Sequence, residues 1–258
     1  MIDVIANYHS HTTRCRHARG TEREYVEKAI ERGLQIFGFS DHAPQFFPGD
    51  YYSTMRMFPE QLPEYCQTVR ALQEEYKGKI DIPLGVEAEY YPCSWKELIP
   101  RLQDQGVEYM ILGQHWAYNE YDAPYSGEPK TDAKALSAYC DQVITAMETG
   151  KFTYVAHPDI YRFVGDQKTH LQELRRICVA SKETNTPLEI NFLGLAAHRN
   201  YPNPLFWEIV GEEGCDVVFG IDAHAPEEIP DRKPEMMALA MVREFQLNIL
   251  ETVTFKKI

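Results

Sequence analysis

The feature that most constrains the fold is an alternation of short apolar runs and amphipathic helical stretches along the whole chain. The apolar runs have the length of strands buried on both faces, and they are 4–8, 36–39, 82–86, 109–113, 152–156, 188–192 and 216–221. The helical stretches between and after them, several of which end at a glycine, are 21–32, 59–76, 94–105, 132–149, 168–184, 203–213 and 234–245. This repeated alternation is typical of a parallel sheet with crossover helices.

The size of the chain favours one barrel rather than two domains. Its 258 residues match a single α/β barrel, which takes roughly 200–250 residues or more. No shift in composition marks a linker, so we expect residues 1–258 to form one domain. Two longer segments, 43–58 and 116–131, are rich in proline, phenylalanine and tyrosine and follow predicted strands. We expect them to form walls over one end of the fold.

The charge balance excludes several classes of partner. A net charge of −13 is unsuited to a nucleic-acid polymer or an anionic membrane, both of which need a basic surface. No apolar run approaches the roughly 20 residues of a membrane-spanning helix. The six cysteines are scattered, which favours reduced thiols, and no secretion signal is visible. We therefore expect a cytoplasmic protein, whose substrate can still be a small anion if a cationic pocket exists locally.

Histidines and carboxylates lie at the carboxyl ends of nearly all the predicted strands. In a parallel barrel these ends share one face, where catalytic residues sit. The candidates at these ends, together with His17 in the loop after the first strand, are His9, His11, His42, Glu87, Glu89, His115, His157, Asp222 and His224. The pairs separated by one residue point to the same side of an extended strand. We expect one cluster.

Imidazole and carboxylate ligands suit Zn, Mn or Fe better than Mg or Ca. The candidates exceed the three or four ligands of a single catalytic zinc, so we expect two to three divalent transition metals, which would attract a phosphate group. Asp41 and Asp159 are predicted to orient neighbouring histidines. Arg162 and Arg199 follow strand ends on the same rim and are candidate phosphate contacts. Glu89 is predicted to contact the substrate or to support a ligand from behind, rather than to bind a metal.

These motifs resemble those of the polymerase and histidinol phosphatase (PHP) superfamily. The matching segments are His9-Ser10-His11, Cys15-Arg16-His17, Phe39-Ser40-Asp41-His42-Ala43, Gly85-Val86-Glu87, Gly113-Gln114-His115, Ala156-His157-Pro158 and Gly220-Ile221-Asp222-Ala223-His224. Within the superfamily, the chain is most similar to the monofunctional histidinol-phosphate phosphatases, in which aspartate is common at the position of Glu89. The resemblance implies a distorted (β/α)7 barrel of the TIM type with a three-metal site.

The resemblance also implies how the ligands are shared. His9, His11, Glu87 and Asp222 would hold the first metal, and His17, His42 and His224 the second. Glu87 would bridge to a third metal held by His115 and His157.

The expected reaction is hydrolysis of L-histidinol phosphate, a small phosphate monoester, to L-histidinol and phosphate. Glu87, Asp222 and His224 would take part in catalysis, with Asp222 or His224 protonating the leaving oxygen. Two alternatives stay open. The first is a phosphoesterase of the same superfamily that acts on a nucleotide or an oligonucleotide end. The second is a non-catalytic module that binds metal or a protein partner.

Overall fold

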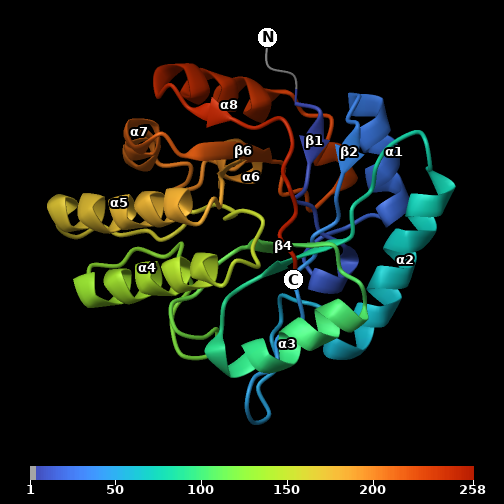
Figure 1. The fold of residues 1–258 in the computed structure, drawn as a ribbon, viewed down its shortest axis with the longest axis horizontal. Coiled ribbons are helices and arrows are strands. Elements are labelled where there is room, and N and C mark those ends of the chain that lie inside the picture. Colours follow the sequence, from blue (N-terminus) through green and yellow to red (C-terminus); the bar gives the residue numbers. More distant parts are fainter. Residues whose placement is uncertain (1–3) are drawn as a thin grey trace.

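The computed structural model describes residues 4–258 and shows an α/β fold in which helices surround a central set of short strands (Figure 1). The strands are β1 (Ala6–Asn7), β2 (Ile36–Phe37), β3 (Gly85–Ala88), β4 (Tyr109–Leu112), β5 (Leu188–Asn191), β6 (Asp216–Gly220) and β7 (Asn248–Ile249). The helices are α1 (Glu22–Arg32), α2 (Leu62–Glu75), α3 (Pro92–Asp104), α4 (Ala133–Glu148), α5 (Gln167–Glu183), α6 (Phe192–Ala196), α7 (Pro204–Glu213) and α8 (Lys233–Glu244). The predicted alternation is confirmed, although α6 and β7 were not predicted.

All the strand pairs are parallel, as predicted, but they form separate small sheets. In the described part of the chain these are β1–β2, β3–β4 and β5–β6–β7. The predicted strand at 152–156 has only an isolated bridge at Val155, which pairs with Leu112 on one side and Leu188 on the other. Elsewhere in the described residues the strands are connected only by isolated bridges. The prediction of a parallel α/β fold is therefore confirmed, whereas the closed barrel is not seen as a single sheet.

The core has two parts. The larger part packs the helices against the outer faces of the strands. A smaller cluster fills the space between the strands and comprises Ala6, Tyr8, Tyr109, Ile111, Tyr154, Ala156 and Val218. The buried hydroxyl of Tyr109 donates a hydrogen bond to the carbonyl oxygen of Tyr8 (2.8 Å), so this aromatic filling also satisfies backbone groups.

Helix boundaries follow the predicted signals. At the start of α1, the Thr21 side chain accepts from the Glu24 backbone while the Glu24 carboxylate accepts from Thr21, which is the reciprocal capping box expected from the sequence. The helix ends at Gly33, whose φ of 88° lies in the left-handed region that glycine adopts freely.

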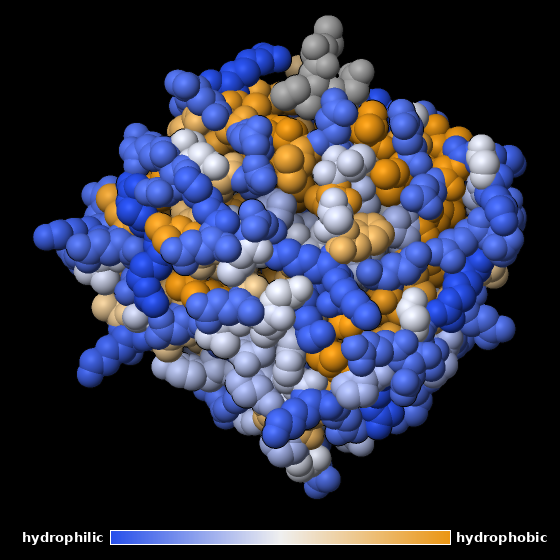
Figure 2. Space-filling model, viewed as in Figure 1, coloured by the Kyte–Doolittle hydropathy of each residue, from blue (hydrophilic) through white to orange (hydrophobic). Residues whose placement is uncertain are grey.

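The surface is mostly polar. Figure 2 shows charged and polar side chains over most of one face, with smaller apolar areas between them. None of the helices in residues 4–258 combines the length and the apolarity needed to cross a bilayer.

Candidate metal centre

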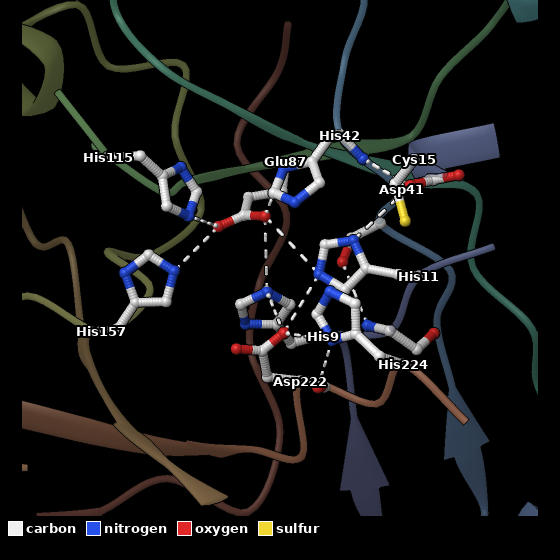
Figure 3. Close-up of polar contacts among 12 residues, drawn as sticks. His9, His11, Cys15, Asp41, His42, Glu87, His115, His157, Asp222 and His224 are labelled. Carbon is white, nitrogen blue, oxygen red and sulfur yellow. Dashed lines mark hydrogen bonds and ion pairs between the residues drawn. The ribbon is translucent and has the colours of Figure 1, made fainter. Parts of the chain in front are cut away.

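The predicted ligands come together around one cavity of about 530 Å³. The ligand residues that line it are His11, His17, His42, Glu87, His115, His157, Asp222 and His224. His9 is fully buried beside them, with its Nε2 atom 3.4 Å from Asp222 Oδ1. The expectation that these side chains gather at one end of the strands agrees with the structure (Figure 3).

Glu87, on β3, is at the centre of the cluster. Its Oε1 atom lies 3.0 Å from His157 Nε2 and 3.7 Å from His115 Nε2. Its Oε2 atom lies 2.9 Å from His42 Nδ1 and 3.6 Å from His11 Nε2. In Figure 3 the carboxylate lies between these two groups of imidazoles. One side chain thus presents an oxygen to each half of the cluster, which is the geometry needed to bridge two cations.

The second carboxylate of the cluster, Asp222, follows the carboxyl end of β6. Its Oδ1 atom lies 3.1 Å from His11 Nε2 and 3.5 Å from His224 Nδ1. Asp222 has a φ of 56° and His157 a φ of 31°, in a region that side chains other than glycine seldom adopt. Such backbone strain persists where the surrounding structure enforces it, commonly at functional sites.

Four imidazoles, those of His11, His17, His42 and His224, pack ring against ring on one side of the cavity. The rings of His11 and His224 are 4.1 Å apart between centroids, and those of His17 and His224 are 4.7 Å apart. His42 is 4.4 Å from His11 by the same measure. His17 is the exposed member of this group, so this half of the cluster opens to solvent.

The donor set fits bound metal ions. Several buried ring nitrogens of the cluster have no hydrogen-bond partner within residues 4–258: His9 Nε2, His11 Nδ1, His157 Nδ1 and His224 Nε2. His42 Nδ1 and Glu87 Oε2 face each other at 2.9 Å, but not with the angles of a hydrogen bond. Buried polar atoms almost always have partners, and imidazole nitrogens and carboxylate oxygens are ligands that transition metals bind. The grouping of His9 with Glu87 and His157, and of His11 with His42 and His224, places ligand atoms close enough to share an ion.

Without metal, the histidines of the cluster ionise differently from one another. Burial alone would lower the pKa values of His9 and His11. Neighbouring carboxylates, Asp222 first, instead hold the pKa of His9 well above its ordinary value and raise that of His11 to about 9, so a metal ion would displace protons from these rings.

Burial lowers the pKa of His224 to about 3 and the pKa of His42 well below its ordinary value, so both rings are neutral near pH 7 and offer a lone pair. Burial alone would raise the pKa of Glu87, but the neighbouring histidines, His42 first, hold that pKa well below its usual range. Asp222 has a lowered pKa for the same reason, with His9 as the strongest neighbour.

Glu189, on β5, was missed in the sequence and supports two of the predicted ligands. Its Oε1 atom lies 2.8 Å from His9 Nδ1, and its Oε2 atom accepts the backbone N–H of His157 at 2.9 Å. Asn191 donates to Glu189 (3.1 Å) and to Asp222 (3.0 Å). The signal was present, because Glu189 and Asn191 are polar residues at alternate positions of an otherwise apolar run.

Two glycines make room for the carboxylates. A Cβ atom at Gly113 would lie 1.7 Å from Glu87 Oε1, and one at Gly220 would lie 1.5 Å from Glu189 Oε1. Gly113 directly follows β4, which pairs with β3, and Gly220 is on β6, which pairs with β5, so any larger residue at either position would displace the carboxylate.

Glu89 has the second of its two expected positions, behind a ligand and not on the substrate side. It is buried and does not line the cavity. Its Oε1 atom lies 3.0 Å from His115 Nδ1, and both its oxygens accept hydrogen bonds from Arg56. The structure therefore places Glu89 behind a predicted ligand rather than against a substrate. Arg56, in the segment 43–58, was not singled out because a lone arginine in an aromatic loop gives no sequence signal.

The two arginines of the rim are separated. Arg199 lines the ligand cavity and donates to the Tyr201 hydroxyl at 2.7 Å. Arg162 is exposed and lines an adjoining cavity of about 700 Å³, which Arg199, Tyr201 and Tyr125 also line. Only Arg199 of this pair reaches the ligand cavity itself.

The two predicted orienting aspartates also differ. Asp41 Oδ1 lies 3.5 Å from His11 Nδ1, and the Thr12 hydroxyl donates to Asp41. Asp159 instead accepts from the Asn203 backbone N–H and from the Trp207 indole N–H. The prediction that Asp159 orients a histidine is therefore wrong, because its carboxylate faces the start of α7.

Parallel strands that deliver imidazoles and carboxylates to one cavity define this protein as an α/β domain with a candidate metal centre. Residues 7–192 match the family model described as the PHP domain. The match covers more than half of the chain, and the chain belongs to the PHP domain family.

Several relatives resemble the chain over nearly its whole length. A protein of Deinococcus radiodurans named "Probable histidinol-phosphatase" is 30% identical over 259 residues, covering 98% of this chain and 96% of that protein. The histidinol-phosphatase of Bacillus subtilis is 23% identical over 84% of this chain and 92% of its own length. The crystal structure of histidinol phosphate phosphatase from Lactococcus lactis, complexed with zinc, L-histidinol and phosphate, superposes with a TM-score of 0.73 at 20% identity, covering 97% of this chain and 99% of that one. This last likeness shows that the fold is shared.

Proposed function

We propose that the protein is a metal-dependent phosphatase that hydrolyses L-histidinol phosphate to L-histidinol and phosphate. The observation that carries the proposal is the convergence of buried imidazole nitrogens on the Glu87 carboxylate, several of which have no hydrogen-bond partner. The names of the full-length relatives support this choice of substrate. The reaction belongs to histidine biosynthesis.

We assign two to three divalent transition ions, Zn, Mn or Fe, to the cluster. The proposed ligands are His9, His11, Glu87 and Asp222 for the first, His17, His42 and His224 for the second, and Glu87, His115 and His157 for the third. When bound, these ions neutralise charge on the phosphoryl oxygens and lower the pKa of the attacking water. Glu87 and Asp222 hold the ligand cage together by facing several imidazoles each.

We further propose that the strands form a distorted (β/α)7 barrel and that residues 1–258 make up one domain. Isolated parallel bridges support a ring, since they link Phe39 to Leu84, Leu112 to Val155, and Ser10 to Ala223. A ring would bring all the carboxyl ends of the strands to one face.

Arg199 is the proposed contact for the phosphoryl group, because its guanidinium lines the ligand cavity. A guanidinium presents paired N–H donors that match phosphate oxygens. Arg162 would contact the substrate from the adjoining cavity. Tyr125 and Tyr201 line both cavities and offer apolar surface for a substrate ring.

Glu228 is the proposed contact for the ammonium group of L-histidinol phosphate. It lines the cavity, and its Oε2 atom accepts the backbone N–H groups of His224 (2.7 Å) and Ala225 (3.1 Å). It is the carboxylate of the cavity wall that is not among the proposed ligands. A cationic group of the substrate therefore has a fixed anionic partner at this wall.

The leaving oxygen of the substrate needs a proton. Asp222 and His224 are both unprotonated near neutral pH, because their pKa values are lowered. We therefore propose that Asp222 first accepts the proton of the attacking water and then returns it to the leaving oxygen.

A panel of phosphate esters tests the proposed function. The metal-loaded protein is expected to hydrolyse L-histidinol phosphate with the highest kcat/KM of a panel that also holds mononucleotides and 5′- and 3′-phosphorylated oligonucleotides. A preference for a nucleotide or an oligonucleotide end would favour the alternative phosphoesterase. Absence of turnover on every ester, with metal bound, would favour a non-catalytic module. The expected cytoplasmic location stays a prediction that cell fractionation tests.

A further inference from the structure

Arg56 is a buried cation that no predicted step of the reaction uses. Its side chain is 2% exposed. The guanidinium binds Glu89 through two hydrogen bonds, from Nη1 to Oε2 (2.8 Å) and from Nη2 to Oε1 (2.9 Å). It also binds Glu120 Oε2 from Nη2 (2.6 Å) and Nε (3.0 Å). One guanidinium thus joins the end of β3 to the segment 116–131.

This ion cluster is poorly explained as a stabilising device. Removing an arginine and two carboxylates from water costs several kcal/mol per ion in order of magnitude, and apolar residues often serve stability as well or better. Stability alone therefore does not explain this network. The residues that contact it indicate another role.

The first neighbour is a predicted metal ligand. Glu89 Oε1 lies 3.0 Å from His115 Nδ1, and His115 Nε2 faces Glu87 Oε1 at 3.7 Å. A carboxylate at Nδ1 keeps the proton on that nitrogen, so the lone pair of Nε2 points into the site. Arg56 donates to both oxygens of Glu89 and so fixes the orientation of this carboxylate. The carboxylate in turn fixes the orientation of the His115 imidazole.

The second set of neighbours is the cavity wall. Thr54 and Met55, directly before Arg56, line the ligand cavity. The guanidinium also donates to the carbonyl oxygen of Ala43 (3.3 Å), which follows the predicted ligand His42. The segment 43–58 is therefore anchored at the same point that orients His115.

We propose that Arg56 is a positioning residue for the metal centre, acting through Glu89 to hold His115 in its ligand orientation and through its own loop to hold one wall of the cavity. The inference rests on the proposed function, since it requires that His115 binds a metal.

The test compares two variants that cut the same network at different points. Arg56→Met removes the partner of Glu89, whereas Glu120→Gln leaves the Arg56–Glu89–His115 chain intact. Both are expected to lower the melting temperature. Zinc affinity is measured on metal-free protein by equilibrium dialysis against buffered free zinc, with metal content read by mass spectrometry.

Arg56→Met is expected to lower the affinity for one of the bound zinc ions by about 10- to 100-fold, the usual effect of disturbing the groups behind a metal ligand. Glu120→Gln is expected to leave all zinc affinities within about 3-fold of the unchanged protein, in keeping with that principle. Arg56→Lys keeps the charge but not the two-pronged contact, so it is expected to fall between them. It also serves if Arg56→Met does not fold.

A second readout reports the orientation directly. In the metal-free protein, the imidazole N–H resonance of His115 should appear as a protected signal in nitrogen-15 NMR and should be lost in Arg56→Met but not in Glu120→Gln. Equal zinc affinities and a retained His115 signal in Arg56→Met and Arg56→Lys would overturn the inference. If the unchanged protein binds no transition metal, the proposed function fails instead.

Discussion

The candidate centre has an inner half, which includes His9 and His115, and an outer half, which includes His17 and His224. Different groups support the imidazoles of the two halves. On the inner half, buried carboxylates back the imidazoles, with Glu189 at Nδ1 of His9 (2.8 Å) and Glu89 at Nδ1 of His115 (3.0 Å). A carboxylate partner raises the basicity of the opposite ring nitrogen and fixes the ring.

On the outer half, backbone carbonyl oxygens take the same place. His17 Nδ1 lies 2.8 Å from the carbonyl oxygen of Cys15, and His224 Nδ1 lies 3.0 Å from that of Asp222. His17 is also exposed. The difference indicates that the inner imidazoles would bind metal tightly in fixed orientations. A metal on the outer, more exposed imidazoles is expected to exchange more readily.

The largest effect is expected where the two halves meet. Glu87→Gln removes the carboxylate that faces both, so it should abolish tight metal binding and lower kcat/KM for L-histidinol phosphate by on the order of 10³-fold, because the ions that would stabilise transition-state charge are lost. Metal analysis and steady-state kinetics measure the two effects together. A Glu87→Gln protein that keeps its metals and its activity would contradict the proposal that Glu87 bridges two metal ions.

A smaller effect is expected on the inner half alone. Glu189→Gln should lower the affinity for one metal ion by about 10- to 100-fold, because His9 loses its charged partner. Glu183→Gln, at the end of α5 and not part of the cavity lining, is the matched control and should leave the metal affinities unchanged. Equal metal affinities for both variants would remove the distinction between the two halves.

The outer half is expected to lose its metal first. When the loaded protein is treated with a chelator, a fast phase should precede slower release, because carbonyl-backed and exposed ligands hold an ion less firmly. His17→Ala should remove the fast phase and leave the slow one. Stopped-flow measurement with a chromogenic chelator separates the phases, and a single phase in both proteins would contradict the comparison.

The smallest expected effect is on substrate binding at Glu228, in the wall of the cavity. Glu228→Gln should raise KM for L-histidinol phosphate about 10-fold, since a hydrogen bond to a charged group is worth ~1.5–3 kcal/mol and each 1.4 kcal/mol is tenfold. The analogue that lacks the amino group should show the same KM with both proteins. An equal rise for both substrates would mean that Glu228 acts through the fold and not on the ammonium group.

Much of this centre was predictable from the sequence because parallel strands deliver their carboxyl ends to one face. Position in the alternation was sufficient to select His9, Glu87 and Asp222. The supporting residues were harder to predict. Glu189 was visible only as a polar residue in a buried strand, and Arg56 depends on a contact between two loops that no periodicity encodes.

The strand lengths were the weakest part of the prediction. The run 152–156 is apolar and hydrogen bonds to both neighbours, yet it makes only a bridge at Val155. Hydrophobicity identified the buried segments, but how many residues of a segment pair with its neighbours depends on contacts between strands, which an apolar run does not encode. The direction of Arg162 was equally hidden, since an arginine after a strand end can turn toward either of two adjoining cavities.

Anomalous diffraction at the zinc edge, from crystals grown with zinc and phosphate, tests the central claim most directly. The account predicts peaks on both sides of the Glu87 carboxylate, one toward His11 and Asp222 and one toward His115 and His157. Zinc bound away from Glu87, or no anomalous peak within the cluster at saturating zinc, would contradict a metal centre built around this residue.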